Sequence, residues 1–255
     1  MLGCGPAGLL VAHAAELSGW DFKIFSRKQK SPLYGAQYLH HAIPEAESGM
    51  ASRVEYRLRG TAEQYRHKVY GALWDCTTSP EDYIESHFAW DIRVVYEHLW
   101  DKYADYISPI DLPFNAHEAL KKVDAISHDC DLVVSTLPRK LWARPGDVFK
   151  SQKIWALGDG DYERVRLHRP EDFTVVCSGL PEDEWYRVSN IFGYCTMEWP
   201  CFGINPPVRG ASIVEKPLEH NSRYASHIVH LGRYGEWRKG VLTTDAFFDA
   251  MRLFQ

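Results

Sequence analysis

The hydrophobic period of the chain changes from helical to alternating within the first 26 residues. Ala7–Leu17 is rich in Ala and Leu and closes at Ser18-Gly19, which predicts a helix that ends at a glycine. Asp21–Phe25 alternates in polarity before the polar Ser26, which predicts a strand that ends in a loop. A turn, a helix, a second turn and a strand form the first half of a βαβ unit.

A half-exposed strand is predicted at Arg53–Arg59, where apolar and polar residues alternate. Gly60-Thr61 then begins a helix through Tyr70, with Thr61 as its N-cap. A longer helix is predicted to begin at Ser79-Pro80-Glu81-Asp82. Its apolar residues fall at helical spacing, at Ile84, Phe88, Ile92, Val95, Tyr96, Leu99 and Tyr103.

The rest of the chain predicts mainly strands. Residues 185–199 indicate one or two antiparallel strands with a bend at Gly193. Further short strands are expected at 131–138, 153–157, 173–177 and 227–231. Thr243-Thr244-Asp245 then caps a last amphipathic helix that runs to Phe254.

Glycines at the head of the first helix have the spacing of a dinucleotide-binding loop. In the run Gly3-Cys4-Gly5-Pro6-Ala7-Gly8, Gly3 allows a tight turn and Gly5 lets a pyrophosphate approach the backbone. Gly8 allows the helix to pack closely on a strand. The helix N-terminus then binds phosphate through its free N–H groups and its dipole. The alternative interpretation is a glycine-rich helix entry without a ligand.

Two features near this loop depart from the usual dinucleotide pattern. The Asp or Glu expected to bind the adenosine ribose is replaced by Ser26, which is followed by Arg27. Ser26 is a weaker ribose ligand, whereas Arg27 suits adenine or a phosphate. Only Met1 and Leu2 precede the loop. We therefore expect either several more apolar residues before Met1 in the natural protein or weak binding of the dinucleotide.

Two other segments carry signals for the same ligand. Gly232-Arg233-Tyr234-Gly235-Glu236-Trp237 follows a predicted strand, and its glycines permit close approach of the backbone to a ligand. A helix N-terminus near Val241 would stabilise negative charge on the N1–C2=O edge of a flavin. The third segment is the predicted strand that ends in Thr136-Leu137-Pro138. Alone, the Gly232–Trp237 segment would be better explained as a surface turn before a helix, and a strand that ends in Thr-x-Pro is a common pattern.

Together, the three segments resemble the FAD-binding flavoprotein superfamily, which includes amine oxidases, protoporphyrinogen oxidase and UDP-galactopyranose mutase. Gly3–Gly8 matches the family's pyrophosphate motif, and 131–138 looks like its mid-chain strand returning to the nucleotide domain. Gly232–Trp237 is similar to its C-terminal flavin-contacting segment, most closely that of the mutase branch. Gly35-Ala36-Gln37 lies where the family has a second flavin-contacting loop.

The resemblance implies FAD as the cofactor and an α/β fold. It implies a Rossmann-like parallel sheet with a truncated first strand and an inserted, reduced α+β substrate domain. Residues 1–44, 115–140 and 222–255 would form the FAD-binding domain, and 45–114 and 141–221 the substrate domain. The implied cofactor-binding residues are Gly3, Gly5, Pro6, Ala7, Gly8, Ser26, Arg27, Gly35, Ala36, Gln37, Thr136, Pro138, Gly232, Arg233, Gly235, Trp237 and Val241.

Four residues are candidates for catalysis. His40 and His41 point to opposite sides of an extended chain, so one of them faces the pocket, where a His acts as acid or base near neutral pH. Tyr186 and Arg187 would suit an anionic substrate, because Arg binds carboxylate or phosphate through two parallel hydrogen bonds. The alternatives are a structural His and an exposed sheet face.

Composition narrows the class of protein. Of the 255 residues 45% are apolar and 25% are charged, as in a soluble globular protein, and the net charge of −5 provides no basic surface that would favour nucleic acid. No apolar run approaches the roughly 20 residues of a membrane span. The six cysteines lack a C-x-x-C pair and metal-like spacing, so we expect reduced thiols, no metal site and a cytoplasmic location.

We therefore expect an FAD-dependent oxidoreductase, in which the flavin takes a hydride or electrons from a small or nucleotide-linked substrate. Two alternatives stay open. A mutase-like isomerase would use reduced flavin without net redox change, and a non-catalytic binding protein would keep the flavoprotein fold alone. The sequence does not decide between oxidase, dehydrogenase and mutase, and it does not give the oligomeric state.

Overall fold

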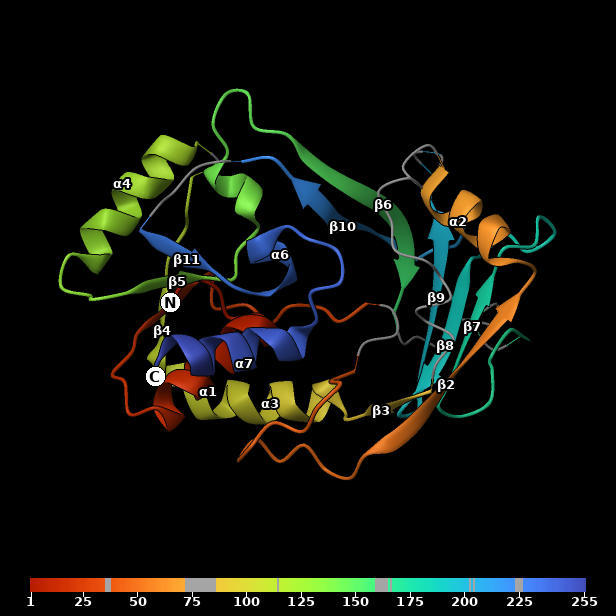
Figure 1. Ribbon diagram of the computed structural model, residues 1–255, viewed down its shortest axis with the longest axis horizontal. Helices are drawn as coiled ribbons and strands as arrows, with labels where there is room; N and C mark the ends of the chain where they lie inside the picture. Colours follow the sequence, from red (N-terminus) through yellow and green to blue (C-terminus); the bar gives the residue numbers. More distant parts are fainter. Residues whose placement is uncertain are drawn as a thin grey trace.

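The computed structural model describes residues 1–34, 38–71, 86–113, 115–158, 165, 167–201, 203, 205–222 and 227–255. Two regions can be distinguished in Figure 1. One holds short parallel strands and most of the helices, and we call it the glycine-loop region (the described residues of 1–34, 91–142 and 227–255). The other is a large sheet with one helix beside it, which we call the sheet region (the described residues of 52–71, 87–89 and 149–222).

Four short strands and the first two residues form a parallel arrangement in the glycine-loop region. β1 (Ile24–Ser26) pairs with β4 (Ile107–Pro109), and β5 (Val133–Ser135) pairs with β11 (Ile228–His230). Leu2 lies between the two pairs, because its N–H donates to the Val134 carbonyl at 2.8 Å and its carbonyl accepts from Thr136 at 3.0 Å. On the other side, Gly3 donates to the Phe25 carbonyl at 2.9 Å. Two extended residues thus join all the parallel strands.

Helices cover both faces of these strands. α1 (Pro6–Leu17), α3 (Ile92–Tyr103) and α7 (Thr243–Leu253) share an apolar core with Ile24 and Val134. α4 (Ala116–Ser127) packs on the opposite face with Leu2 and Val133. The adjacent Val133 and Val134 enter different cores because successive side chains of a strand alternate in direction. The shorter elements of this region are η3 (Ala104–Tyr106), η4 (Arg139–Trp142) and α6 (Gly232–Glu236).

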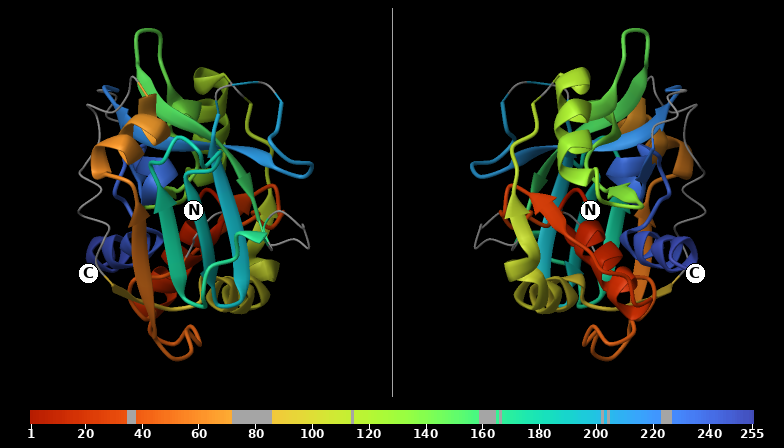
Figure 2. Two further views of the ribbon diagram at one scale, coloured as in Figure 1. Left: turned by 90° about the vertical axis from the view of Figure 1, so that its right-hand side faces the viewer. Right: turned by 90° about the vertical axis from the view of Figure 1, so that its left-hand side faces the viewer.

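The sheet region contains seven strands, antiparallel except for the parallel pair β2 and β7. Phe192 and Gly193, with φ of 53° and 80°, form the two-residue hairpin turn that connects β8 to β9. Figure 2 shows the strands side by side with the helix α2 (Ala62–Tyr70) beside them. The strand order is β10 (Ser212–His220), β6 (Phe149–Leu157), β9 (Tyr194–Pro200), β8 (Arg187–Ile191), β7 (Thr174–Ser178), β2 (Ser52–Arg59) and β3 (His87–Ala89).

Most of the predicted elements are confirmed, and one is wrong. The first and last helices, the strand at 53–59, the hairpin at 185–199 and the Thr61 cap all form, with Thr61 accepting from Gln64 N at 3.2 Å. The long helix from Ser79 does not form as predicted. Residues 79–85 lie outside the described residues, and His87–Ala89 is strand β3, paired with β2. The helix begins only after its N-cap Asp91, because cross-strand pairing outweighs the helical spacing of Phe88. α4 and β10 were not predicted.

Candidate functional site

The glycine loop folds back on itself, which is possible because its glycines have no side chains. Gly3 has a φ of +105°, which side-chain-bearing residues rarely adopt. A Cβ on Gly8 would overlap the Gly3 carbonyl oxygen, so the start of α1 lies directly on the loop. Gly5 is the N-cap, Pro6 is in the first turn, and that turn contains no acidic residue. The positive end of α1 is therefore not neutralised by its own side chains, as an anion site requires.

The segments that the sequence predicted to share a ligand meet at this loop. A Cβ on Gly3 would lie 2.7 Å from Thr136 Oγ1, and one on Gly232 would lie 3.0 Å from the Cβ of Ala7. A Cβ on Gly235 would lie 2.8 Å from the Ser135 carbonyl oxygen. Segments 100 or more residues apart thus approach each other where only glycine fits. Small residues that clear the backbone around a helix N-terminus fit a dinucleotide.

The end of β1 holds the two residues predicted for the adenosine. Ser26 Oγ accepts from the Cys4 thiol at 3.0 Å, which ties it to the glycine loop. Arg27 donates to Asp111 Oδ1 through Nε at 3.1 Å and Nη2 at 2.9 Å, and both side chains are exposed. Asp111 follows β4, the parallel neighbour of β1. A carboxylate, that of Asp111, therefore lies at the sheet edge where β1 ends in Ser26 and not in an acidic residue. It follows the neighbouring strand β4 and not β1 itself. The strand β4 was not predicted, so the position of Asp111 after it was not predicted either.

A cleft of about 360 Å³ adjoins the loop and was not predicted. Tyr96 connects the two, because its hydroxyl donates to the Cys4 carbonyl at 3.1 Å and accepts from Ser31 N at 2.9 Å. Lys30 and Arg93 bring positive charge to the cleft, with Lys30 paired to Glu97.

The C-terminal candidates are mostly packing residues around this site. Trp237 is buried and donates from Nε1 to the Lys150 carbonyl at 3.0 Å, and Val241 is also buried. Arg233 Nη2 donates to the Pro217 carbonyl at 3.4 Å, and Pro138 directly precedes η4. At the start of α7, Asp245 accepts from Leu242 N at 2.8 Å. Gly35, Ala36 and Gln37 lie outside the described residues.

His40 and His41 lie on different sides of their segment. His40 is tied to α7, since its backbone N–H donates to Thr244 Oγ1 at 3.1 Å. Its ring lies 4.6 Å from that of Tyr38 and 5.6 Å from that of His87. Burial, with help from His87 and His41, lowers the pKa of His40 to about 4, so the ring is neutral at pH 7. The His41 ring packs edge-on against Phe248.

Tyr186 and Arg187 belong to a buried ionic cluster around Glu198. Arg187 Nη2 donates to Glu198 Oε1 at 2.6 Å, and the Tyr186 hydroxyl donates to Oε2 at 2.5 Å. Lys216 Nζ lies 3.1 and 3.0 Å from the two oxygens. Burial alone would raise the pKa of Glu198, but Arg187 and Lys216 outweigh it and hold that pKa at about 2. Burial and Arg187 lower the pKa of Lys216 to about 7, against the opposing effect of Glu198. The sequence analysis did not name Glu198 or Lys216.

Two of the predicted catalytic groups therefore bind a carboxylate of the protein itself. Their hydrogen bonds to Glu198 use the Tyr186 hydroxyl and Arg187 Nη2, whereas Arg187 Nε has no partner among the described residues. Their role in substrate binding remains a prediction. Within the described residues, no helix combines the length and the apolar character needed to cross a membrane.

No known family model and no curated protein matches the chain. Solved structures do match. A mutant of 2-methyl-3-hydroxypyridine-5-carboxylic acid oxygenase is 12% identical over 100% of this chain and 80% of its own, with a TM-score of 0.53. A candidate FAD-containing monooxygenase from Photorhabdus luminescens is 10% identical over 100% and 86%, with a TM-score of 0.49. The 2,6-dihydroxypyridine-3-hydroxylase of Arthrobacter nicotinovorans is 9% identical over 99% and 81%, with a TM-score of 0.46. The first likeness shows that this α/β chain shares the fold of that oxygenase.

Proposed function

We propose that this protein binds FAD and acts as an FAD-dependent oxidoreductase on a small-molecule substrate. The observation that carries the proposal is the convergence of Gly3–Gly8, Thr136 and Gly232 on the N-terminus of α1. A helix entry without a ligand would need one close packing contact, but here two glycine-bearing segments and the strand end at Thr136 meet at the same place. The fold shared with an oxygenase supports the same conclusion.

The residues of the site would hold FAD from two ends. The N-terminal amides of α1 would bind the pyrophosphate, with Lys30 and Arg93 near it, and Asp111 or Ser26 would bind the ribose. The start of α7 would face the flavin, with the Asp245 carboxylate already bound to the Leu242 N–H there. When bound, the flavin would supply hydride or electron transfer.

The substrate is proposed to lie between α7 and the sheet region. His40, Tyr38 and His87 gather there, and the Tyr38 hydroxyl lies 3.0 Å from that of Tyr56. These rings favour a flat aromatic or heteroaromatic substrate. His40, neutral at pH 7, would accept a proton from it. Arg187 and Lys216 outnumber Glu198 in charge, which supports an anionic substrate.

The two-domain division is also kept as a proposal, with one change. Residues 45–114 were expected to belong to the substrate domain, but α3 shares the core of α1, and β4 pairs with β1. We therefore assign α3 and β4 to the FAD-binding part. The five described cysteines form no disulfide, which supports the proposed cytoplasmic location.

The test is binding of FAD by the purified protein and by two glycine variants. Wild type should bind FAD and show visible flavin absorption bands. Gly5→Ala should keep the melting temperature, because its Cβ would meet only the Ser31 side chain at 3.2 Å, but should weaken FAD binding at least tenfold. The control Gly203→Ala adds a Cβ that meets nothing within 4 Å, and it should change neither. A colourless wild type that ignores added FAD would refute the proposal.

Substrate turnover then separates the alternatives. In the first experiment, a reductant bleaches the flavin without oxygen. Reoxidation of the flavin only when substrate and oxygen are both added would support oxygenation. Activity only with pre-reduced flavin and no net electron transfer would support the mutase-like isomerase. Bound FAD without any turnover would support a non-catalytic binding protein.

A further inference from the structure

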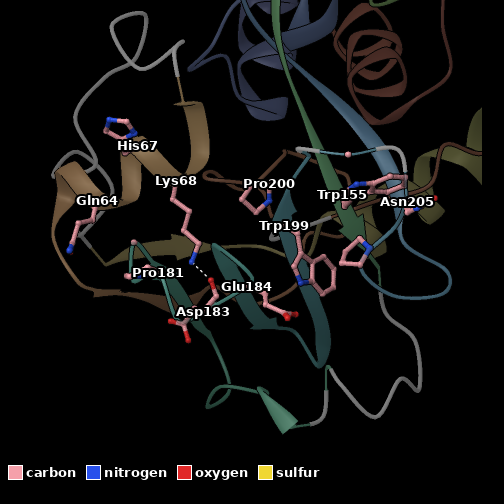
Figure 3. Close-up of a pocket in the computed structure, with 13 residues that line it drawn as sticks. Gln64, His67, Lys68, Trp155, Pro181, Asp183, Glu184, Trp199, Pro200 and Asn205 are labelled. Carbon is pink, nitrogen blue, oxygen red and sulfur yellow. Dashed lines mark hydrogen bonds between the residues drawn. The ribbon is translucent and has the colours of Figure 1, made fainter.

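A second, larger pocket lies beside α2, at the end of β9 (Figure 3). Its volume is about 900 Å³, within the range of about 300–1,000 Å³ typical of small-molecule sites. Residues of α2, the turn after β7 and the ends of β6 and β9 line it. Its lining contains no residue of the glycine loop, of 136–138 or of 232–244. It therefore requires an explanation separate from FAD.

Flat apolar groups form one wall of the pocket. Trp155 on β6 and Trp199 on β9 are direct cross-strand partners, so their indoles lie on the same face of the sheet. Figure 3 shows the two indoles on the side opposite Lys68, with Pro200 beside Trp199. Pro181 adds a further rigid apolar surface. Such a wall fits the apolar face of a ring.

Trp199, one of the lining residues, also carries a hydrogen-bond donor without an acceptor among the described residues. The side chain is 2% exposed, and its Nε1–H has no acceptor among the described residues. A buried donor without an acceptor costs about 1–3 kcal/mol, and indole N–H groups are normally paired when buried. A ligand atom that accepts this hydrogen bond would satisfy it.

Charges on the opposite wall are balanced. Lys68 donates to the carbonyls of Leu180, at 2.7 Å, and Asp183. The Asp183 carboxylate binds Arg59 at 3.0 Å and the Ser178 hydroxyl. The Glu184 carboxylate completes this wall. Arg59, which lies outside the lining, neutralises Asp183, and the lining adds one cation, Lys68, and one carboxylate, Glu184, so the pocket has no excess charge to select an ion.

We propose that this pocket binds a neutral saccharide ring. A sugar hydroxyl both donates and accepts, so it can donate to Glu184 while a ring or hydroxyl oxygen accepts from Trp199 Nε1. The C–H face of the ring packs on the indole and proline wall. A quaternary ammonium would leave the Trp199 donor unpaired, and an anion would face Glu184.

The test is an NMR titration of the indole N–H resonances in ¹⁵N-labelled full-length protein. The probes are cellobiose and maltose, with nicotinamide and tetramethylammonium as comparators. A disaccharide should shift the Trp199 Nε1–H resonance saturably. Trp199→Phe should weaken binding about tenfold, the effect of losing about 1.4 kcal/mol. The matched control is Trp142→Phe, because Trp142 is also a buried indole whose N–H lacks an acceptor among the described residues, but it lies in the core of α4. It should leave the affinity unchanged.

Three outcomes would overturn the proposal. One is no saturable shift with either disaccharide in the high-millimolar range. Another is a shift of Trp199 only with nicotinamide or only with tetramethylammonium. The third is equal weakening by Trp199→Phe and Trp142→Phe, which would indicate a general loss of packing. Melting temperatures of both variants show whether the fold is kept. The FAD titration is read separately, so its outcome does not decide this one.

Discussion

The two regions of the molecule hold their candidate residues in opposite ways. In the glycine-loop region the candidates are brought together by absent side chains, as at Gly8 against Gly3 and at Gly232 against Ala7. In the sheet region the candidates Tyr186 and Arg187 are held by a side chain of the protein itself, Glu198. The glycine positions of the first therefore allow its backbone segments to approach closely, whereas in the second the partner of Tyr186 and Arg187 is a carboxylate of the protein. A glycine motif therefore predicts its local structure better than a charged residue predicts its partners.

Of the changes that test this contrast, removal of the Glu198 charge should have the largest effect, which is on stability. Glu198→Gln leaves Arg187 as a buried cation without a counter-charge, while Lys216, whose pKa is already about 7, loses its proton; this should lower the free energy of unfolding by about 3–5 kcal/mol. Urea unfolding followed by circular dichroism measures this loss. The matched control is Glu219→Gln on β10, whose partner Lys150 lies at the surface, and it should cost less than about 1 kcal/mol. Equal losses in both variants would mean that the cluster is not an internal ionic core.

A substitution in the glycine-loop region should have its largest effect on FAD binding. Gly8→Ala places a Cβ on the Gly3 carbonyl oxygen, so the loop must move away from α1. We expect FAD affinity to fall about 100-fold, equivalent to about 2.7 kcal/mol, with a lower melting temperature. Isothermal titration with FAD measures the first effect. Gly5→Ala is the internal comparison, since it should weaken binding without loss of stability. Retained FAD affinity in Gly8→Ala would place the cofactor elsewhere.

The contrast also explains what could be predicted from the sequence. The Gly3–Gly8 motif, the helix that follows it and the Thr61 cap depend on residues close together in the chain, and they form as predicted. The partners of Arg187 depend on strand register. Glu198 lies opposite it across the β8–β9 hairpin, and Lys216 comes from β10, a strand that the pattern did not reveal. Asp111 was missed for the same reason, because its position is set by the pairing of β1 with β4.

Acid should destabilise the fold through His40 and His230. Burial lowers the folded pKa of His40 and of His230 from 6.5 to about 4. The unfolded state therefore binds more protons between these values, so stability is highest above pH 6.5 and falls as the pH drops towards 4. We expect about 2 kcal/mol for each ring, less than the full linkage value because both are partly solvated.

Urea unfolding at several values across this pH range gives the slope of the free energy of unfolding against pH. His40→Phe and His230→Phe should each flatten it by a similar amount, and the double variant by about the sum, since the two rings lie in different parts of the fold. A slope unchanged in His40→Phe would mean that this ring is solvated, which would remove the basis for its role as a neutral proton acceptor.

The smallest effect is expected at Arg27, where the sequence and the structure differ most in what they imply. The sequence places this guanidinium over adenine or a phosphate, but in the structure it makes two hydrogen bonds to Asp111, with both side chains exposed. Exposed pairs of this kind contribute about 0–1 kcal/mol, so Arg27→Ala should change the free energy of unfolding by less than about 0.5 kcal/mol. It should also change FAD affinity by no more than about threefold, whereas Asp111→Asn should weaken it about tenfold if this carboxylate binds the ribose. Isothermal titration of both variants decides between the two residues. A tenfold loss in Arg27→Ala with none in Asp111→Asn would mean that Arg27 leaves Asp111 to bind the dinucleotide, and that the exposed pair exists only without it.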